Sequence, residues 1–142
     1  MLDGRRITKA YLKEITIAVT GAAIEVHKHL GPGLLESIYQ ECMMHELTLR
    51  GIKYESEKML SINYKNLSLK GKYKCDLYVE NCLVLEYKTV SEILPIHQAQ
   101  ILTYMRILNA PKGIIINFNG HKIFPSGQKT LVNNLFWQLP DR

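Results

Sequence analysis

The sequence has few cysteines and lacks any long hydrophobic run. Its three cysteines, Cys42, Cys75 and Cys82, form no CxxC pair, and their odd number argues against a disulfide framework, so we expect reduced thiols partly in the core. No apolar run approaches the roughly 20 residues that a membrane-spanning helix needs. The N-terminal stretch MLDGRRITKAYLKEI lacks the apolar segment of a secretory signal. We therefore expect a cytoplasmic protein with no membrane partner.

Two familiar catalytic motifs are also missing, because the chain has neither a Walker-type glycine loop nor a GxSxG elbow. What remains is an ordinary globular composition, with 46% hydrophobic and 22% charged residues. A length of 142 residues fits one domain, over residues 1–142, with a single core. The net charge of +5 is compatible with a polyanionic partner, although such a surplus is common.

The hydrophobic pattern predicts two helices followed by three strands. Apolar residues recur at three- and four-residue steps from about residue 7 to 30, and a second helical pattern spans residues 34–50. The period then changes to partial alternation over residues 54–66 and 67–80, which predicts a hairpin. A short break leads to a third strand over residues 82–90.

The remaining pattern predicts a helix, a strand and a C-terminal helix. Pro95 suits the first turn of a helix running to residue 110, and residues 113–119 form a continuous apolar run typical of a strand buried on both faces. We expect a short edge strand at 121–125, and a closing helix over 128–139 with Trp137 packed on the body. The order α-α-β-β-β-α-β indicates an α/β fold with a mixed central sheet flanked by helices.

Two charged side chains interrupt the apolar run LVLEYKTV at residues 83–90. Glu86 and Lys88 are two residues apart, so on a strand they point to the same face. A buried charge is costly unless it is paired or binds a metal. Asp76 lies late in the preceding strand. If the two strands pair around residues 80–81, Asp76 falls opposite Glu86 and their side chains converge.

Two carboxylates and a lysine at one point allow two interpretations. Carboxylates with no added base suit Mg²⁺ or Mn²⁺ rather than zinc. A lysine beside them can orient or deprotonate a water molecule, or stabilise charge on a phosphate. The structural alternative is a buried ion-pair cluster. Spacing alone leaves both interpretations open, because three-residue patterns recur by chance.

One part of this pattern resembles a known superfamily. Asp76, nine intervening residues and then Glu86-Tyr87-Lys88 resemble the D…ExK half-motif of the PD-(D/E)XK nucleases. Cys75 occupies the position where the superfamily name places proline. The resemblance covers about residues 15–118, and it implies a restriction-endonuclease-like core.

Two further blocks strengthen the resemblance. The stretch IEVHKHLGPGLLESIY is similar to the signature of the GxxExxY family within that superfamily, and its three letters fall at Gly33, Glu36 and Tyr39. The stretch HQAQILTY resembles the helix that follows the catalytic strand, with Gln100 and Tyr104 as a QxxxY element. The three blocks occur in the expected order.

The resemblance implies roles for these residues. Asp76 and Glu86 would bind a divalent cation, Mg²⁺ or Mn²⁺, helped by the backbone carbonyl of Tyr87. Lys88 would position the attacking water. Glu36 would approach from the second helix as an additional metal or water ligand.

Other residues are candidates for contacts with nucleic acid. Gln100 and Tyr104 are one helical turn apart, so both can address one groove, and His97 shares that face as a weaker candidate. Lys72 and Lys74 belong to a lysine-rich segment upstream of the acids. That segment is interpreted either as a basic rim beside the site or as a solvated strand face.

Several candidates also have a purely structural interpretation. Glu25, His27 and His29 fit a solvated helix end better than a zinc site, although Glu25 stays a second-rank candidate because it lies in the family-like block. Tyr39, like Tyr104, can be a core-edge residue. Glu36 in the first turn of a helix can simply stabilise the helix dipole.

Three hypotheses follow for the function. The first is a metal-dependent nuclease that hydrolyses phosphodiester bonds, with DNA favoured over RNA as the partner. The second is a non-catalytic nucleic-acid-binding module of the same fold, and the third is a small scaffold subunit. Strandedness, internal or terminal cutting and oligomeric state stay open, although a small domain that cuts a duplex would need a homodimer to reach both strands.

Overall fold

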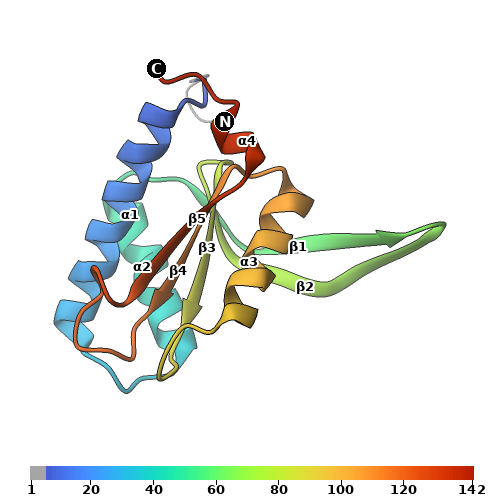
Figure 1. Cartoon of the computed structure of the whole chain (residues 1–142). Coiled ribbons are helices and arrows are strands. Elements are labelled where there is room, and N and C mark those ends of the chain that lie inside the picture. The colour runs from blue at the N-terminus through green and yellow to red at the C-terminus, as the bar shows by residue number, and fades with distance from the viewer. Residues whose placement is uncertain (1–5) are drawn as a thin grey trace.

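A computed structural model describes residues 6–142 and shows a five-stranded sheet covered by helices on both faces (Figure 1). The first five residues of the predicted 1–142 domain lie outside this range. The two N-terminal helices cover one face of the sheet and the third helix covers the other. In chain order the elements are α1 (Lys9–Leu30), α2 (Glu36–Leu49), β1 (Tyr54–Tyr64), β2 (Leu67–Val79), β3 (Leu83–Lys88), α3 (Pro95–Leu108), β4 (Lys112–Asn117), β5 (Gln128–Val132) and α4 (Asn134–Trp137).

The sheet is mixed, as the sequence predicts, and its strand order is β1-β2-β3-β4-β5. The pair β3–β4 is parallel and every other pair is antiparallel. The crossover from β3 to β4 passes through α3, as a parallel connection requires. β4 is buried on both faces, because α1 and α2 cover one side and α3 the other. The expected doubly buried strand is therefore confirmed.

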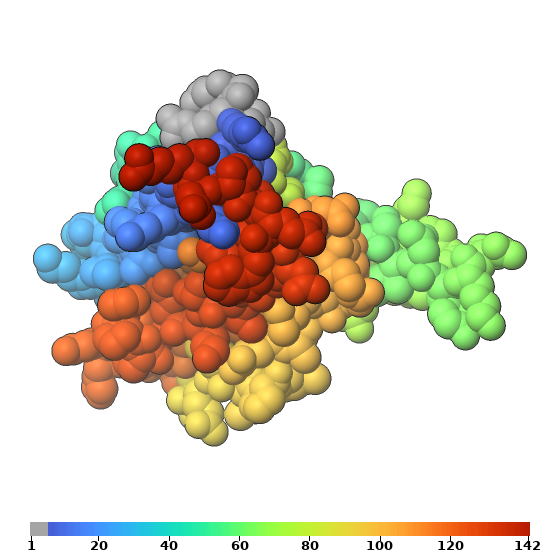
Figure 2. Space-filling view, turned by 45° about the horizontal axis from the view of Figure 1, so that its top comes forward, coloured from blue at the N-terminus to red at the C-terminus, as the bar shows by residue number. Residues whose placement is uncertain are grey.

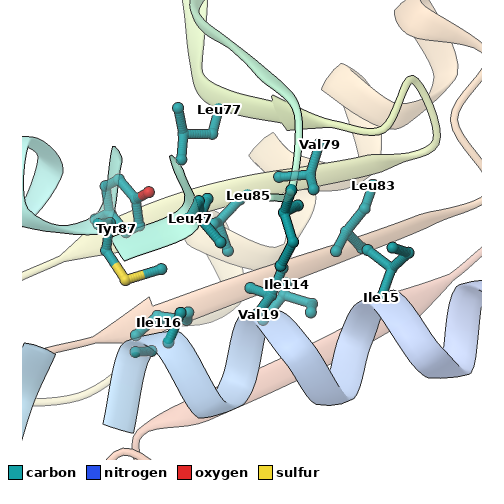
Figure 3. Close-up of a cluster of buried hydrophobic side chains, with 14 of the residues drawn as sticks. Ile15, Val19, Leu47, Leu77, Val79, Leu83, Leu85, Tyr87, Ile114 and Ile116 are labelled. Carbon is teal, nitrogen blue, oxygen red and sulfur yellow. The ribbon is translucent and has the colours of Figure 1, made fainter. Parts of the chain in front are cut away.

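The larger part of the core lies between the sheet and the two N-terminal helices (Figure 3). Alternate residues of β3 and β4 face this layer, and α1 covers them with Ile15 and Val19. The intervening residues of the same strands, among them Val84 and Ile115, face α3 instead. Glu86 and Lys88 are two and four residues after Val84, so on a strand their side chains point to the same face as Val84. The charged end of β3 therefore lies on the α3 side.

Local sequence explains where the helices begin and end. The Thr8 hydroxyl accepts a hydrogen bond from the Tyr11 N–H at 3.0 Å and caps α1. Gly31 ends that helix with a positive φ of 70°, a conformation that glycine adopts without steric cost. Pro95 opens α3, as predicted, and Asn109 ends it in the left-handed region.

β1 and β2 continue beyond the sheet as a projecting hairpin, and we call its residues 58–75 the arm (Figures 1 and 2). Its turn lies at residues 65–66, where the sequence predicts it. The register passes from Leu60 opposite Tyr73 to Ser61 opposite Lys70, so two residues of β2 bulge out. One of them is Gly71, whose φ of 77° suits a bulge.

The C-terminal segment differs from the prediction. Residues 121–125 form a loop, and the edge strand is β5, the first part of the expected closing helix. β5 pairs antiparallel with β4. Asn133 then caps the one-turn helix α4 through its side chain, which accepts from the Leu135 N–H. Trp137 is 66% exposed, so the expectation that it packs on the body is wrong.

Two smaller expectations concern cysteines and membranes. All three cysteines are free, with Cys75 and Cys82 buried, as expected. Within residues 6–142, none of the helices combines the length and apolarity required to span a bilayer.

Candidate functional site

The site forms where β2 and β3 separate at the end of their ladder. The last paired residues are Leu77 and Leu85, so Asp76 and Glu86 face each other one step beyond, as the sequence predicts. Each carboxylate accepts a hydrogen bond from a backbone N–H of the opposite strand, in place of a backbone carbonyl. Glu86 Oε1 accepts from the Asp76 N–H at 3.0 Å, and Asp76 Oδ2 accepts from the Tyr87 N–H at 2.8 Å. The acid pair is therefore fixed by backbone on both sides.

The acid pair is largely removed from water, and Glu86 is only 7% exposed. Burial and the neighbouring carboxylate of Asp76 raise the pKa of Glu86 to about 9. Burial also raises the pKa of Asp76. Hydrogen bonds from the Tyr87 N–H and from the Glu86 carboxyl lower this pKa, but burial is the larger effect. At neutral pH the pair accordingly holds a proton, carried by Glu86 and shared with Asp76. A divalent cation would take the place of that proton.

Lys88 lies next to the acids and is positioned from β4. Its carbonyl accepts from the Phe118 N–H at 2.9 Å. The Asn117 side chain binds both the N–H and the carbonyl of Val90, which holds the segment directly after the lysine. Within residues 6–142 the Lys88 ammonium makes no hydrogen bond and no ion pair. The closed ion-pair cluster that the sequence leaves open is thus not formed.

α2 approaches the acid pair through two side chains on one face. The exposed Glu36 accepts a hydrogen bond from the Thr89 hydroxyl at 3.5 Å, and its charge raises the pKa of Asp76 after the larger effect of burial. One turn later, Gln40 Nε2 donates to the Asp76 carbonyl at 2.9 Å. Sequence reasoning missed Gln40. Its spacing of four residues from Glu36 is the signal that would have identified it.

α3 brings the remaining helical candidates to the same side of the sheet. Gln100, Tyr104 and His97 line one groove together with Lys88. Burial, and then the charges of Glu86 and Asp76, raise the pKa of Tyr104 to about 12. His97 has a local role as well, because its Nδ1 accepts from the Leu94 N–H at the start of α3.

Among residues 6–142, none of the other candidates makes a hydrogen bond or ion pair with the acid pair. Lys72 and Lys74 are exposed on the arm. Glu25 forms an exposed ion pair with His29 at 2.8 Å, and the third residue of that motif, His27, hydrogen bonds the Gly120 carbonyl. Tyr39 is fully buried and stacks on Phe118, with ring centroids 4.4 Å apart.

The donors at the acid pair suit a hard cation. Two carboxylates and a nearby backbone carbonyl are oxygen ligands, and Mg²⁺ commonly binds through one or two carboxylates while keeping several waters. Over residues 6–142, no three or more Asp, Glu, His or Cys side chains gather as a metal site. The structure therefore leaves Glu36 outside the pair, and its role as a ligand stays a prediction.

Comparisons with known proteins give the family of the chain. A family model described as the PD-(D/E)XK nuclease superfamily matches residues 13–129. The crystal structure of SSO0001 is similar at 19% sequence identity and a TM-score of 0.43, over 84% of this chain and 65% of that one, so this chain spans less than two thirds of that protein. A search of curated proteins finds no match. Because the family model covers most of the chain, the chain belongs to the PD-(D/E)XK nuclease superfamily.

Proposed function

We propose that this protein is a Mg²⁺- or Mn²⁺-dependent nuclease that hydrolyses phosphodiester bonds of nucleic acid, with DNA favoured over RNA. The observation that carries the proposal is the pairing of a buried, backbone-fixed acid pair with a lysine that has no partner of its own within the described residues. Asp76, Glu86 and the carbonyl of Tyr87 would hold the cation. When bound, such a cation polarises a phosphate and lowers the pKa of a water ligand.

The side chains of the site have separate tasks in this proposal. The two backbone N–H donors keep Asp76 and Glu86 in place before any ligand arrives, so little reorganisation is required. Lys88, fixed through the Asn117–Val90 clamp, orients the attacking water and stabilises negative charge on the phosphate. Gln40 acts through the Asp76 carbonyl and is a positioning residue.

We further propose that the chain belongs to the GxxExxY branch of the superfamily. The geometry of the loop between α1 and α2 supports this assignment. The Tyr39 hydroxyl donates to the Gly31 carbonyl and accepts from the Leu34 N–H at 3.3 Å. The tyrosine of the pattern thereby fixes the loop that contains Gly33, and Glu36 begins α2 directly after it. The pattern is then a structural unit that presents a glutamate near the acid pair.

The test is cleavage of labelled DNA and RNA, single- and double-stranded, in Mg²⁺ or Mn²⁺ with EDTA as the control. Wild type should cut at least one substrate and EDTA should stop it. Lys88→Ala should lower the rate about 10²- to 10⁴-fold, whereas Lys13→Ala, an exposed lysine on α1, should cut like wild type. If wild type leaves every substrate intact across broad conditions, the enzyme proposal fails.

A binding module of the same fold is the second candidate, and the basic arm favours it. Residues 58–75 contain five lysines and no acid, which suits a phosphate backbone without any chemistry. Calorimetry separates the two candidates. A nuclease should bind Mn²⁺ at the acid pair and lose that binding in Asp76→Asn, whereas a binding module needs no cation there and should show no such binding in either protein.

A further inference from the structure

A groove of about 670 Å³ lies beside the acid pair, between α3 and the arm. Lys88 stands at its boundary, so the groove is continuous with the site proposed above. The arm forms one wall and α3 the other. The residues that decide its chemistry are Ile62 and Tyr73 from the arm, and Ile96, Gln100 and Tyr104 from α3.

The groove exposes apolar and aromatic surface next to a site of charged groups. Ile96 is 68% exposed, and the Tyr73 side chain is 47% exposed. The ring centroids of Tyr73 and Tyr104 are 6.3 Å apart with a tilt of 54°, so the two rings do not stack on each other and the Tyr73 face stays available. A flat aromatic ligand would remove this surface from water.

The surroundings of the groove favour an anion. Lys88 contributes a cation at the boundary, and the arm contains five lysines and no acid among residues 58–75. Of these lysines, only Lys58 forms an ion pair in the part of the chain that the structure describes, with Glu55 at 3.0 Å, and the ammonium of Lys65 lies over the Tyr64 ring. The occupant should therefore combine an aromatic face with a negatively charged chain. A nucleotide has both properties.

We propose that the groove receives an unpaired base of single-stranded nucleic acid, with the base on Tyr73 and its phosphate at Lys88. The proposal rests on the function proposed above and names its substrate class. Gln100, whose amide makes no hydrogen bond within residues 6–142, can bind the polar edge of the base.

Duplex does not fit this groove. Its bases are stacked and paired, so their faces are not available to Tyr73, and its outer surface is phosphate and sugar. Placing that surface against the exposed Ile96 and the partly exposed Ile62 would leave polar groups without partners. Stacking on aromatic side chains is instead the common way in which proteins hold single strands. A single strand needs one site, so this proposal does not require the homodimer that cutting a duplex would.

The experiment measures binding without cutting, by fluorescence anisotropy in EDTA, with a labelled DNA single strand and a duplex of equal length. We expect tighter binding of the single strand. Tyr73→Ala should weaken it roughly 5- to 100-fold and leave duplex binding unchanged. Tyr64→Ala is the matched control, because Tyr64 is an exposed tyrosine on the same arm that does not line the groove. Tyr73→Phe keeps the ring and should bind like wild type.

A strand with one abasic nucleotide completes the test, since it keeps the charge and lacks the base. Wild type should bind it more weakly than the intact strand, and Tyr73→Ala should bind the two alike. Equal or tighter binding of duplex, or a Tyr73→Ala variant indistinguishable from Tyr64→Ala, would overturn the proposal. This experiment contains no divalent cation and measures only binding, whereas the nuclease proposal is tested by cleavage in Mg²⁺ or Mn²⁺. A negative result for single-strand binding is therefore distinct from a negative result for cleavage.

Discussion

Replacing Glu86 with glutamine should stabilise the metal-free protein while abolishing the proposed nuclease activity. The substitution keeps the shape of the side chain. The glutamine carbonyl can accept from the Asp76 N–H as Oε1 does now, and the amide can donate to the Asp76 carboxylate as the protonated carboxyl does. What the variant loses is a buried group that must bind a proton in the folded state.

The expected magnitude follows from the pKa of Glu86. Burial and Asp76 raise this pKa from 4.5 to about 9. Between these two values the folded chain holds a proton that the unfolded chain has released, so the free energy of unfolding falls as pH rises. From pH 4.5 to pH 7 the loss is about 1.4 kcal/mol per pH unit, which gives a deficit of about 3 kcal/mol at pH 7. The glutamine variant lacks this deficit.

The measurement is urea unfolding in EDTA at pH 5 and pH 7. Glu86→Gln should be more stable than wild type by about 3 kcal/mol at pH 7, and by less than about 1 kcal/mol at pH 5. Adding Mn²⁺ should stabilise wild type and not the variant. Glu92→Gln, which removes an exposed acid, is the control for net charge and should change stability little. A variant no more stable than wild type at pH 7, or a gap that does not narrow toward pH 5, would refute the reasoning.

Three further predictions concern Gln40, the loop that precedes β5 and the groove. Gln40→Ala removes the amide that holds β2 at the acid pair, so kcat should fall about 10- to 100-fold with little change in KM, in steady-state cleavage assays. Gly127→Ala would place a Cβ 2.5 Å from a backbone carbonyl and should cost roughly 2 kcal/mol or more in urea unfolding, whereas Gly120→Ala meets nothing closer than 3.9 Å and should cost less than 1 kcal/mol. Replacing Lys88, the lysine that lines the groove, with alanine should lower the slope of log binding constant against log salt by about 0.7 for single strands in EDTA, and an unchanged slope would place the phosphate elsewhere.

The sequence predicts the position of the acid pair because the position of a hairpin turn fixes the register of its two strands. A short break at residues 80–81 fixes which residues of the two flanking strands face each other, and Asp76 falls opposite Glu86. The ends of α1 and α3 are predictable for a similar reason, since glycine and proline act locally. What the sequence does not reveal is that the ladder opens at this point, because side chains that replace backbone bonds leave no periodic signal.

The edge strand β5 shows the limit of local patterns. Residues 128–139 contain apolar residues at helical spacing, and the sequence alone favours one helix there. In the structure, the exposed edge of β4 offers a full set of ladder partners, and Gln128–Val132 pair with it instead. Tertiary pairing outweighs helix propensity in such a short segment. The role of Gln40 also depends on tertiary structure, because its amide reaches the Asp76 carbonyl only where α2 packs against the sheet.

The opened ladder has a consequence for comparing proteins of this fold. Because Asp76 and Glu86 each accept a hydrogen bond from a backbone N–H, a chain of this fold without nuclease activity would still need both acids to join its two strands. The ammonium of Lys88 makes no hydrogen bond and no ion pair among residues 6–142, and it interacts with the two acids only through its charge, so fewer structural contacts hold it than hold the acids. Among proteins of this fold, the presence of the lysine would therefore distinguish an active nuclease from an inactive one better than the presence of the two acids.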